Sequence, residues 1–276
     1  MSTRTRLVFI LSGILTTFDE TLWAPLFHME GIEKEYLIST WEETPLHEGI
    51  RRLPYTFLEY EKESDIRPLI QQKAAQFLIK PEETKVENTL FMWHKWGRLA
   101  SHLDRYSEDT LVIRVRFDID FSQESMASLL KEVRAFQDQT AYDLSIPSGG
   151  NHRGGLPDIL ALGKVKAMKT YLQLGSDCAA YYQDEHFFHP EWMLRYHLVN
   201  QHHYRIHRFP FRLFIRGVVY NKDSFDCVTD TQKACVSKKF KRRQVPHVPL
   251  NFLNGDLSLR RRWRRWLKGW WSAAPY

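Results

Sequence analysis

Short runs of apolar residues alternate along the chain with segments in which apolar residues recur every three or four positions. The continuous runs are rich in β-branched residues and predict buried strands, whereas the three-to-four spacing predicts amphipathic helices. We expect strands at 6–15, 35–41 and 110–120, and helices at 21–31, 88–103 and from 122 or 123 onward. This alternation predicts an α/β fold with a mixed sheet flanked by helices, parallel in its first half.

Polar residues stand where two of these strands are expected to end. Ser12 and Gly13 close the first run, and Asp118 and Asp120 close the run that begins at Thr110. Ligands of open α/β sheets bind at the carboxyl ends of the strands. Alternation along an extended chain would point both carboxylates to one side, where hard oxygen ligands suit Mg²⁺ or Mn²⁺. The alternative is a strand that ends in solvated turn carboxylates.

A glycine-rich segment, residues 146–158, follows the helix predicted to begin at residue 122 or 123. Its four glycines and two prolines predict a loop whose backbone could approach a ligand, with Arg153 and Asp158 as polar contributors; a plain surface connection is the alternative. Further along, His189-Pro190-Glu191 opens a helix. Glu191 suits either the positive end of that helix or a catalytic role.

Histidine and cysteine spacings argue against a structural zinc site. Several of the twelve histidines lie between His186 and His207, but none is arranged as a paired-ligand motif, and the three cysteines form no Cys-x-x-Cys pair. The cysteine pattern fits a reducing compartment. The apolar run after Arg6 lacks a small-residue cleavage site and is too short to cross a bilayer, so it predicts a core strand and not a signal peptide.

Charge is distributed unevenly between the body and the end of the chain. The net charge is +6, but residues 238–276 hold eleven Lys/Arg and one acid, which makes them +10 and leaves residues 1–237 at −4. We therefore expect a catalytic domain at 1–237 and a basic tail at 238–276.

Within the tail, a helix would place one apolar stripe opposite the cations. The stripe consists of Leu259, Trp263, Trp266, Leu267 and Trp270. The stripe predicts an interfacial helix on an anionic membrane surface; nucleic-acid binding and a disordered tail are the alternatives.

The ordered set of these features resembles the WavE-type glycosyltransferases of bacterial lipopolysaccharide and capsular polysaccharide synthesis. The matching pieces span roughly residues 6–210 and are Ile10–Gly13, Val112–Asp120, Gly155–Gly163 with Met168 and Tyr171, and His189–Glu191. The resemblance implies a GT-A-like fold, with Asp118 and Asp120 as the metal- and diphosphate-binding pair. It further implies that Arg114, Arg116, Asp158 and Glu191 are pocket residues. Related sequences tend to place a polar residue and an Arg after the first Ser-Gly, whereas this chain has Ile14-Leu15-Thr16.

These observations lead us to expect a glycosyltransferase that needs Mn²⁺ or Mg²⁺ and moves a sugar from a nucleotide-sugar to a glycan or lipid-linked glycan. Asp158 is the first candidate for the base that takes the acceptor proton and Glu191 the second. The nucleotide-sugar would be bound by Ser12, Gly13, Arg114, Arg116 and Arg153. We expect the protein in the cytoplasm, on the inner face of the cytoplasmic membrane. A metal-dependent phosphotransferase or nuclease is one alternative, and a non-catalytic nucleic-acid-binding protein is another, although a net negative body argues against nucleic acid as a partner.

Overall fold

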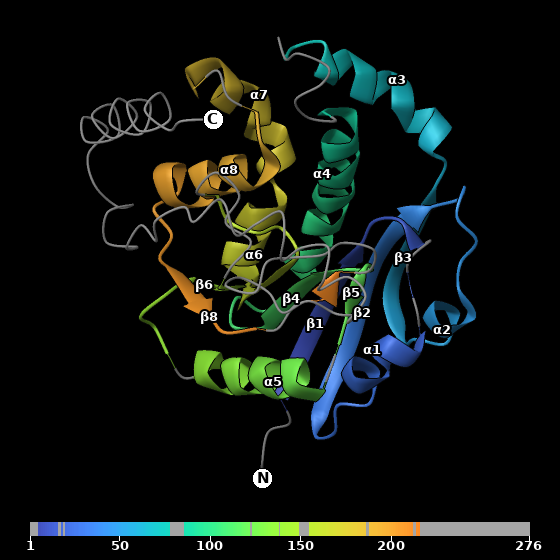
Figure 1. The fold of residues 1–276 in the computed structure, drawn as a ribbon, viewed down its shortest axis with the longest axis vertical. Helices are drawn as coiled ribbons and strands as arrows, with labels where there is room; N and C mark the ends of the chain where they lie inside the picture. The colour runs from blue at the N-terminus through green and yellow to red at the C-terminus, as the bar shows by residue number, and fades with distance from the viewer. Residues whose placement is uncertain are drawn as a thin grey trace, which may run out of the picture. The chain divides into compact units, whose positions relative to one another are not determined.

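A seven-stranded mixed sheet forms the centre of the structure, a computed structural model that describes residues 5–15, 18, 20–77, 86–121, 123–137, 139–148, 155–185, 188–211 and 214–215 (Figure 1). The strand order is β3-β2-β1-β4-β7-β6-β8, and β5 pairs with β9 in a separate two-stranded sheet. The strands are β1 (Thr5–Ser12), β2 (Ile32–Trp41), β3 (Tyr55–Glu61), β4 (Leu111–Arg116), β5 (Ile119–Asp120), β6 (Leu144–Pro147), β7 (Leu160–Lys164), β8 (Ile206–Phe209) and β9 (Phe214–Ile215).

The first four strands of the sheet, β3, β2, β1 and β4, are all parallel, as predicted. The direction changes at β7, which runs antiparallel to both β4 and β6, while β8 is parallel to β6. The carboxyl ends of β1, β2, β3 and β4 therefore meet along one edge of the sheet. That edge is where the predicted polar residues were expected to lie.

Helices cover both faces of the sheet (Figure 1). They are α1 (Glu20–Phe27), α2 (Glu48–Arg51), α3 (Glu63–Ala74), α4 (Val86–Ala100), α5 (Gln123–Gln137), α6 (Val165–Leu172), α7 (Leu174–Glu185) and α8 (Pro190–Arg195), with a 3₁₀ turn at Ser101–Arg105 and a π-helix, η4, at Tyr196–Gln201. Apolar side chains of α4, α6, α7 and α8 form one core cluster with one face of the sheet. Those of α1 and α5 form a second cluster with the opposite face.

Strand β4 shows how the sequence pattern produces this layering. Leu111, Ile113 and Val115 are buried in the cluster under α1 and α5, and Val112 is buried in the cluster under α4 and α6. Because side chains alternate along a strand, Arg114 and Arg116 share the face of Val112. The two guanidiniums thus belong to the side of the sheet that α4 and α6 cover.

Several predicted elements differ from the observed ones. The run 110–120 is not one strand: β4 ends at Arg116, residues 117 and 118 turn, and β5 leaves the main sheet. Phe117 and Ile119 are both buried in the cluster under α1 and α5, on the same side as Ile113 and Val115, so the alternation of buried side chains continues across the turn. The pattern also left 66–77 unassigned, where α3 forms, and missed β3. Among the described residues, no helix combines the length and apolar character needed to cross a membrane.

Candidate functional site

Arg116, the last residue of β4, joins two of the predicted carboxylates. Its Nε donates to Asp118 Oδ1 at 3.0 Å, its second terminal nitrogen donates to Asp118 Oδ2, and its Nη1 lies 3.5 Å from Asp158 Oδ1. The backbone N–H of Arg116 also donates to the carbonyl of Ile159 at 3.1 Å. The end of β4 and the entry to β7 are therefore fastened together, and Asp118 and Asp158 share one guanidinium.

The environment of these three groups differs from one to the next. The Asp158 side chain is 9% exposed, whereas those of Asp118 and Arg116 are 19% and 32% exposed. Asp158 is thus almost closed off from solvent, while Asp118 and the guanidinium can still be reached. A small charged ligand would meet Asp118 and Arg116 before Asp158.

The turn after β4 changes the expected geometry of the Asp118-x-Asp120 pair. Asp118 lies in the turn and Asp120 lies in β5, so the two residues do not alternate along one strand as predicted. The side chain of Asp120 is outside the described part of the structure. The prediction that Asp118 and Asp120 jointly hold a metal is neither supported nor opposed by their placement.

Arg114 is completely buried beneath this cluster. Its guanidinium carbon lies 4.5 Å from the centre of the Trp96 ring, and no hydrogen-bond partner for its three nitrogens is present among the described residues. Burial lowers the pKa of Arg114, and the charge of Asp158 partly opposes this effect. A buried guanidinium without a hydrogen-bond partner is costly, and the charge of Arg114 interacts with those of Asp158 and Asp118.

Tyr171 on α6 lies next to this buried charge, and like Arg114 it has a buried polar atom without a described hydrogen-bond partner. Its ring packs on Trp96 at 5.1 Å, and its buried hydroxyl lacks a partner among the described residues. Burial raises the pKa of Tyr171, so its hydroxyl stays protonated. Tyr171 and Arg114 thus bring two buried donors together near Asp158 without an acceptor among the described residues.

Ser12 and Gly13 end β1 beside Arg116. Ser12 pairs in register with Arg116, and its buried hydroxyl has no described partner. Gly13 adopts φ +127°, a conformation that residues with a side chain rarely adopt, and nothing lies within 4 Å of the position a Cβ would take. Thr40 of β2 donates to the Gly13 carbonyl at 2.8 Å and fixes this strand end.

The segment after the glycine-rich loop packs directly on the start of α8. A Cβ on Gly155 would lie 2.3 Å from the carbonyl carbon of Glu191, and the Leu156 N–H donates to the Glu191 carbonyl at 2.8 Å. The Glu191 carboxylate lies 2.8 Å from His189 Nδ1, and the side chains are 18% and 20% exposed. The structure therefore places Asp158 and Glu191 on two segments that are joined by their backbones. Arg153 lies outside the described residues.

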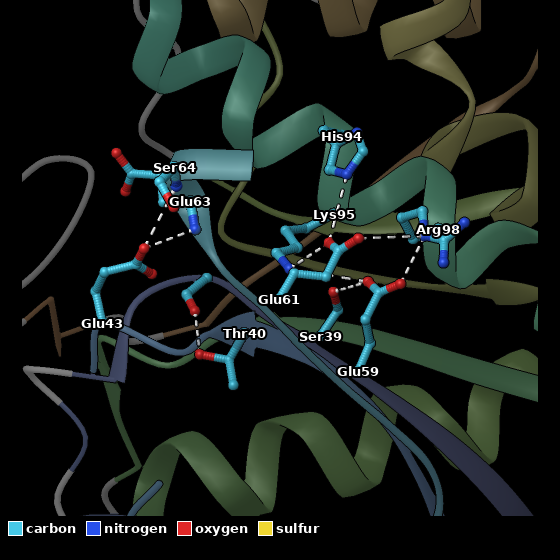
Figure 2. Close-up of polar contacts among 11 residues, drawn as sticks. Ser39, Thr40, Glu43, Glu59, Glu61, Glu63, Ser64, His94, Lys95 and Arg98 are labelled. Atoms are coloured by element: carbon cyan, nitrogen blue, oxygen red, sulfur yellow. Dashed lines mark hydrogen bonds and ion pairs between the residues drawn. The ribbon is translucent and has the colours of Figure 1, made fainter. Parts of the chain in front are cut away.

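A second charged network lies at the carboxyl ends of β2 and β3 and was missed from the sequence (Figure 2). The fully buried Lys95 of α4 donates to Glu61 at 2.6 Å, and its ammonium stands 3.7 Å from the centre of the Trp41 ring. Arg98 donates to Glu59 at 2.6 Å, and Ser39 also donates to Glu59. These ion pairs hold the strand ends next to Gly13 in a fixed arrangement.

The pKa values in this network follow from burial and pairing. Burial lowers the pKa of Lys95, and its contacts with Glu61 only partly oppose that change. Burial alone would raise the pKa of Glu61, but the hydrogen bond and charge of Lys95 outweigh it and lower the value. Burial also lowers the pKa of His94, which lies 3.4 Å from Glu61. One sequence signal was available: a lysine within the apolar stripe of a helix requires a buried partner.

The donor set at the end of β4 suits a hard cation. Asp118 offers two carboxylate oxygens that are partly exposed, and Asp120 follows two residues later; oxygen-only donors fit Mg²⁺ or Mn²⁺ and not a thiophilic metal. A cation there would replace Arg116 as the counter-charge of Asp118. The residues therefore fit the predicted metal in chemical type.

Comparisons with known proteins give distant structural likenesses. Neither a protein-family model nor a curated protein sequence matches the chain. Among solved structures, the apo form of mouse xyloside xylosyltransferase 1 is similar with a TM-score of 0.39 and 10% identity over 74% of this chain and 84% of that one. The galactosyltransferase LgtC, in complex with donor and acceptor sugar analogues, gives a TM-score of 0.38 and 9% identity over 68% of this chain and 69% of that one. Likenesses at this level do not identify a family.

Proposed function

We propose that this chain is a metal-dependent glycosyltransferase that uses a nucleotide-sugar. The observation that carries the proposal is the guanidinium of Arg116, which links Asp118 to Asp158 at the carboxyl end of β4. The charges, the strand ends and the unsatisfied donors gather at the edge where α/β sheets bind nucleotides. The WavE-type resemblance of the sequence points to the same residues.

Departure of a nucleoside diphosphate from the anomeric carbon builds negative charge on the leaving phosphate. Asp118 and Asp120 would hold Mn²⁺ or Mg²⁺, which neutralises that charge when bound. Arg116 can donate two charge-assisted hydrogen bonds to phosphate oxygens, and its partial exposure leaves it reachable. The buried Arg114 adds a further positive charge near Asp158 and Asp118, which favours a diphosphate at this site.

A base for the acceptor hydroxyl has two candidates in this arrangement. Asp158 is close to Arg116 but nearly buried, whereas Glu191 is more exposed and is oriented by His189. A carboxylate that must meet a sugar hydroxyl needs access, and this favours Glu191 once the acceptor binds. Asp158 then serves to position Arg116. This assignment reverses the order expected from sequence.

The acceptor and the location of the protein follow from the tail and from the resemblance. A surface polysaccharide or lipopolysaccharide built on a lipid carrier would lie at the inner face of the cytoplasmic membrane, and the basic, Trp-rich tail would hold the enzyme there. Residues 238–276 lie outside the described part of the structure, so this step rests on sequence. Nucleic acid is not proposed as a partner.

One observation favours a second candidate function, a metal-dependent phosphotransferase or nuclease. Such enzymes gather several acidic ligands around the metal, and the structure brings Asp158 to the same guanidinium as Asp118. The two functions differ in their substrates. A glycosyltransferase cleaves a nucleotide-sugar at the anomeric carbon, whereas a phosphotransferase or nuclease cleaves a phosphoester at phosphorus.

Ligand binding distinguishes the two candidates. The full chain is mixed with Mn²⁺ and a panel of UDP-, GDP-, ADP- and CMP-sugars, and binding is followed by saturation-transfer NMR and thermal shift. We expect one nucleotide-sugar to bind with contacts to both base and sugar and to need Mn²⁺. Cleavage of model phosphodiesters without nucleotide-sugar binding would replace the proposal by the second candidate.

A further inference from the structure

Three possible metal ligands come together beside α6. They are Asp177 from α7, His197 from η4 and His202, which follows η4 directly, and one ligand atom of each lies within 4.8 Å of the others. His197 Nδ1 and Asp177 Oδ2 are 3.7 Å apart. Ligands bound at about 2.0–2.2 Å around one tetrahedral ion lie roughly 3.3–3.6 Å apart, so these two atoms are already close to bonding geometry.

The imidazole of His197 is oriented as a metal ligand requires. It is buried, and its Nε2 lies 2.7 Å from the carbonyl oxygen of Thr170, so Nε2 carries the hydrogen and donates it. Nδ1 then faces Asp177 with its lone pair. Metal-binding histidines almost always donate their second N–H to a carbonyl or a carboxylate, which fixes the ring.

The backbone after α8 brings the second histidine over the first. Residues 196–201 form a π-helix, and the His202 N–H donates to the His197 carbonyl at 3.1 Å, a bond between residues five apart. The two imidazole rings are 4.7 Å apart. The rings meet edge to face, and in an α-helix, with about 3.6 residues per turn, residues five apart would not lie over one another. π-Helices are rare and occur frequently at functional sites.

The next residue carries a related signal. His203 has φ +56°, and it is a left-handed non-glycine residue. Such conformations cluster where the surrounding structure imposes them for a purpose. The π-helix and this residue together turn the chain so that the exposed His202 meets the buried His197.

The Tyr181 hydroxyl lies between two of these ligands. It stands 2.7 Å from His197 Nδ1 and 3.3 Å from Asp177 Oδ2, and because both are acceptors its one hydrogen can serve only one of them at a time. An ion bound between the three residues would take the place of this hydroxyl, which lies on the same side of both ligands. His202 is exposed, so its side chain does not belong to the apolar core.

We propose that Asp177, His197 and His202 bind one first-row transition-metal ion, for which Zn²⁺ is the best match. Two imidazoles and one carboxylate form the ligand set of many zinc sites that keep a fourth position open, and this set is softer than the oxygen-only donors at Asp118. The ion would connect α7 to the segment after α8. The histidine spacing argued against a zinc site because these ligands come from α7, η4 and the residue after it and follow no local spacing motif.

The test uses the metal-stripped full chain and Zn²⁺ alone. We expect Zn²⁺, but not Mg²⁺, to raise the melting temperature, and Co²⁺ to bind with visible absorption typical of a four- or five-coordinate ion with imidazole ligands. His202→Ala, which removes an exposed side chain, should weaken Zn²⁺ binding at least tenfold, and so should Asp177→Asn. His203→Asn is the matched control, because it removes the neighbouring histidine and asparagine tolerates positive φ; its Zn²⁺ affinity should equal that of the wild type.

The outcomes decide the proposal in either direction. Because the chain has twelve histidines, some Zn²⁺ binding elsewhere is expected, and only its dependence on these residues counts. The proposal is overturned if His202→Ala and Asp177→Asn bind Zn²⁺ as tightly as the wild type does. It is also overturned if His203→Asn weakens Zn²⁺ binding as much as these two substitutions do. These measurements do not involve sugar transfer. Failure of the zinc proposal would therefore not affect the proposed glycosyltransferase function, and failure of that function would not affect the zinc proposal.

Discussion

Gly155 lies against the backbone of Glu191, so close that a Cβ on residue 155 would stand 2.3 Å from the Glu191 carbonyl carbon. The adjacent Leu156 N–H donates to the same carbonyl at 2.8 Å. Asp158 follows three residues after this contact, and the Glu191 carboxylate extends from it. One backbone contact therefore sets where the two candidate proton acceptors stand relative to each other.

Substitution of Gly155 by alanine tests this contact. The added methyl would push the start of α8 away, so we expect about 1–3 kcal/mol of destabilisation, as for other overpacked sites, and a clear fall in kcat. Chemical denaturation and a transfer assay measure the two effects. Gly97→Ala is the control: Gly97 is exposed in α4, has nothing within 4 Å of a Cβ, and should gain about 0.5–1 kcal/mol in stability. Equal stability of the two variants would show that the contact does not constrain the site.

The apolar pattern predicted the layers and the parallel half of the sheet because burial on one or both faces leaves a clear period in the sequence. It could not predict the turn at residues 117–118. There, Phe117 and Ile119 are buried on the same side as Ile113 and Val115, as they would be in a continuous strand, so the apolar pattern does not show that β4 ends at Arg116. The side chain of Asp120 lies outside the described residues, so the expected common direction of Asp118 and Asp120 stays a prediction.

The predicted site residues that lie at the ends of neighbouring strands are close together in the structure. Asp118, Arg116 and Asp158 meet, because β4 and β7 are neighbours and their ends coincide. The pattern could not reveal that Arg114 is fully buried, since an arginine in a strand is normally taken as solvated. Nor could it reveal the Lys95–Glu61 pair, whose members lie on different elements and meet only in the folded sheet.

Removal of Lys95 should expose how much the second network contributes. Lys95→Met leaves Glu61 partly buried without its ammonium partner, and breaking such a pair costs about 3–5 kcal/mol. Urea unfolding measures the loss. The double variant Lys95→Met/Glu61→Leu replaces both charges by apolar groups and should regain more than half of it. A single variant within 0.5 kcal/mol of wild type, well below that estimate, would mean that the pair is not structural.

The pKa of Glu61 predicts how stability depends on pH. Its folded pKa is lowered from the ordinary value of 4.5 because the bond and charge of Lys95 outweigh burial. The unfolded carboxylate takes up a proton first as the pH falls, so the stabilisation is complete above about pH 4.5 and is lost as the pH drops through the folded pKa. The stability advantage of wild type over Glu61→Gln should therefore shrink between pH 6 and pH 3. Glu33→Gln, at an exposed position, is the control; an advantage that grows on acidification would contradict the assignment.

Deletion of residues 257–276 tests the membrane tail. Its apolar stripe and six cations between Arg260 and Lys268 should bind vesicles only when anionic lipid is present, and more weakly at high salt. In flotation assays with phosphatidylglycerol vesicles, the full-length protein should bind and the truncated protein should not. Neutral vesicles serve as the control. Equal flotation of both proteins, or of neither, would return weight to the nucleic-acid or disordered interpretations of the tail.

The most direct test of the proposed function compares two aspartates at opposite ends of β4. Asp118 stands at the carboxyl end beside Arg116, whereas Asp109 precedes the strand, is 87% exposed and pairs with Lys164. Mn²⁺-dependent turnover of the nucleotide-sugar found in the binding panel is measured for Asp118→Asn and Asp109→Asn. We expect Asp118→Asn to abolish turnover with a nearly unchanged melting temperature and Asp109→Asn to retain wild-type rates. Full turnover by Asp118→Asn, or by the wild type in excess EDTA, would show that Asp118 holds no catalytic metal.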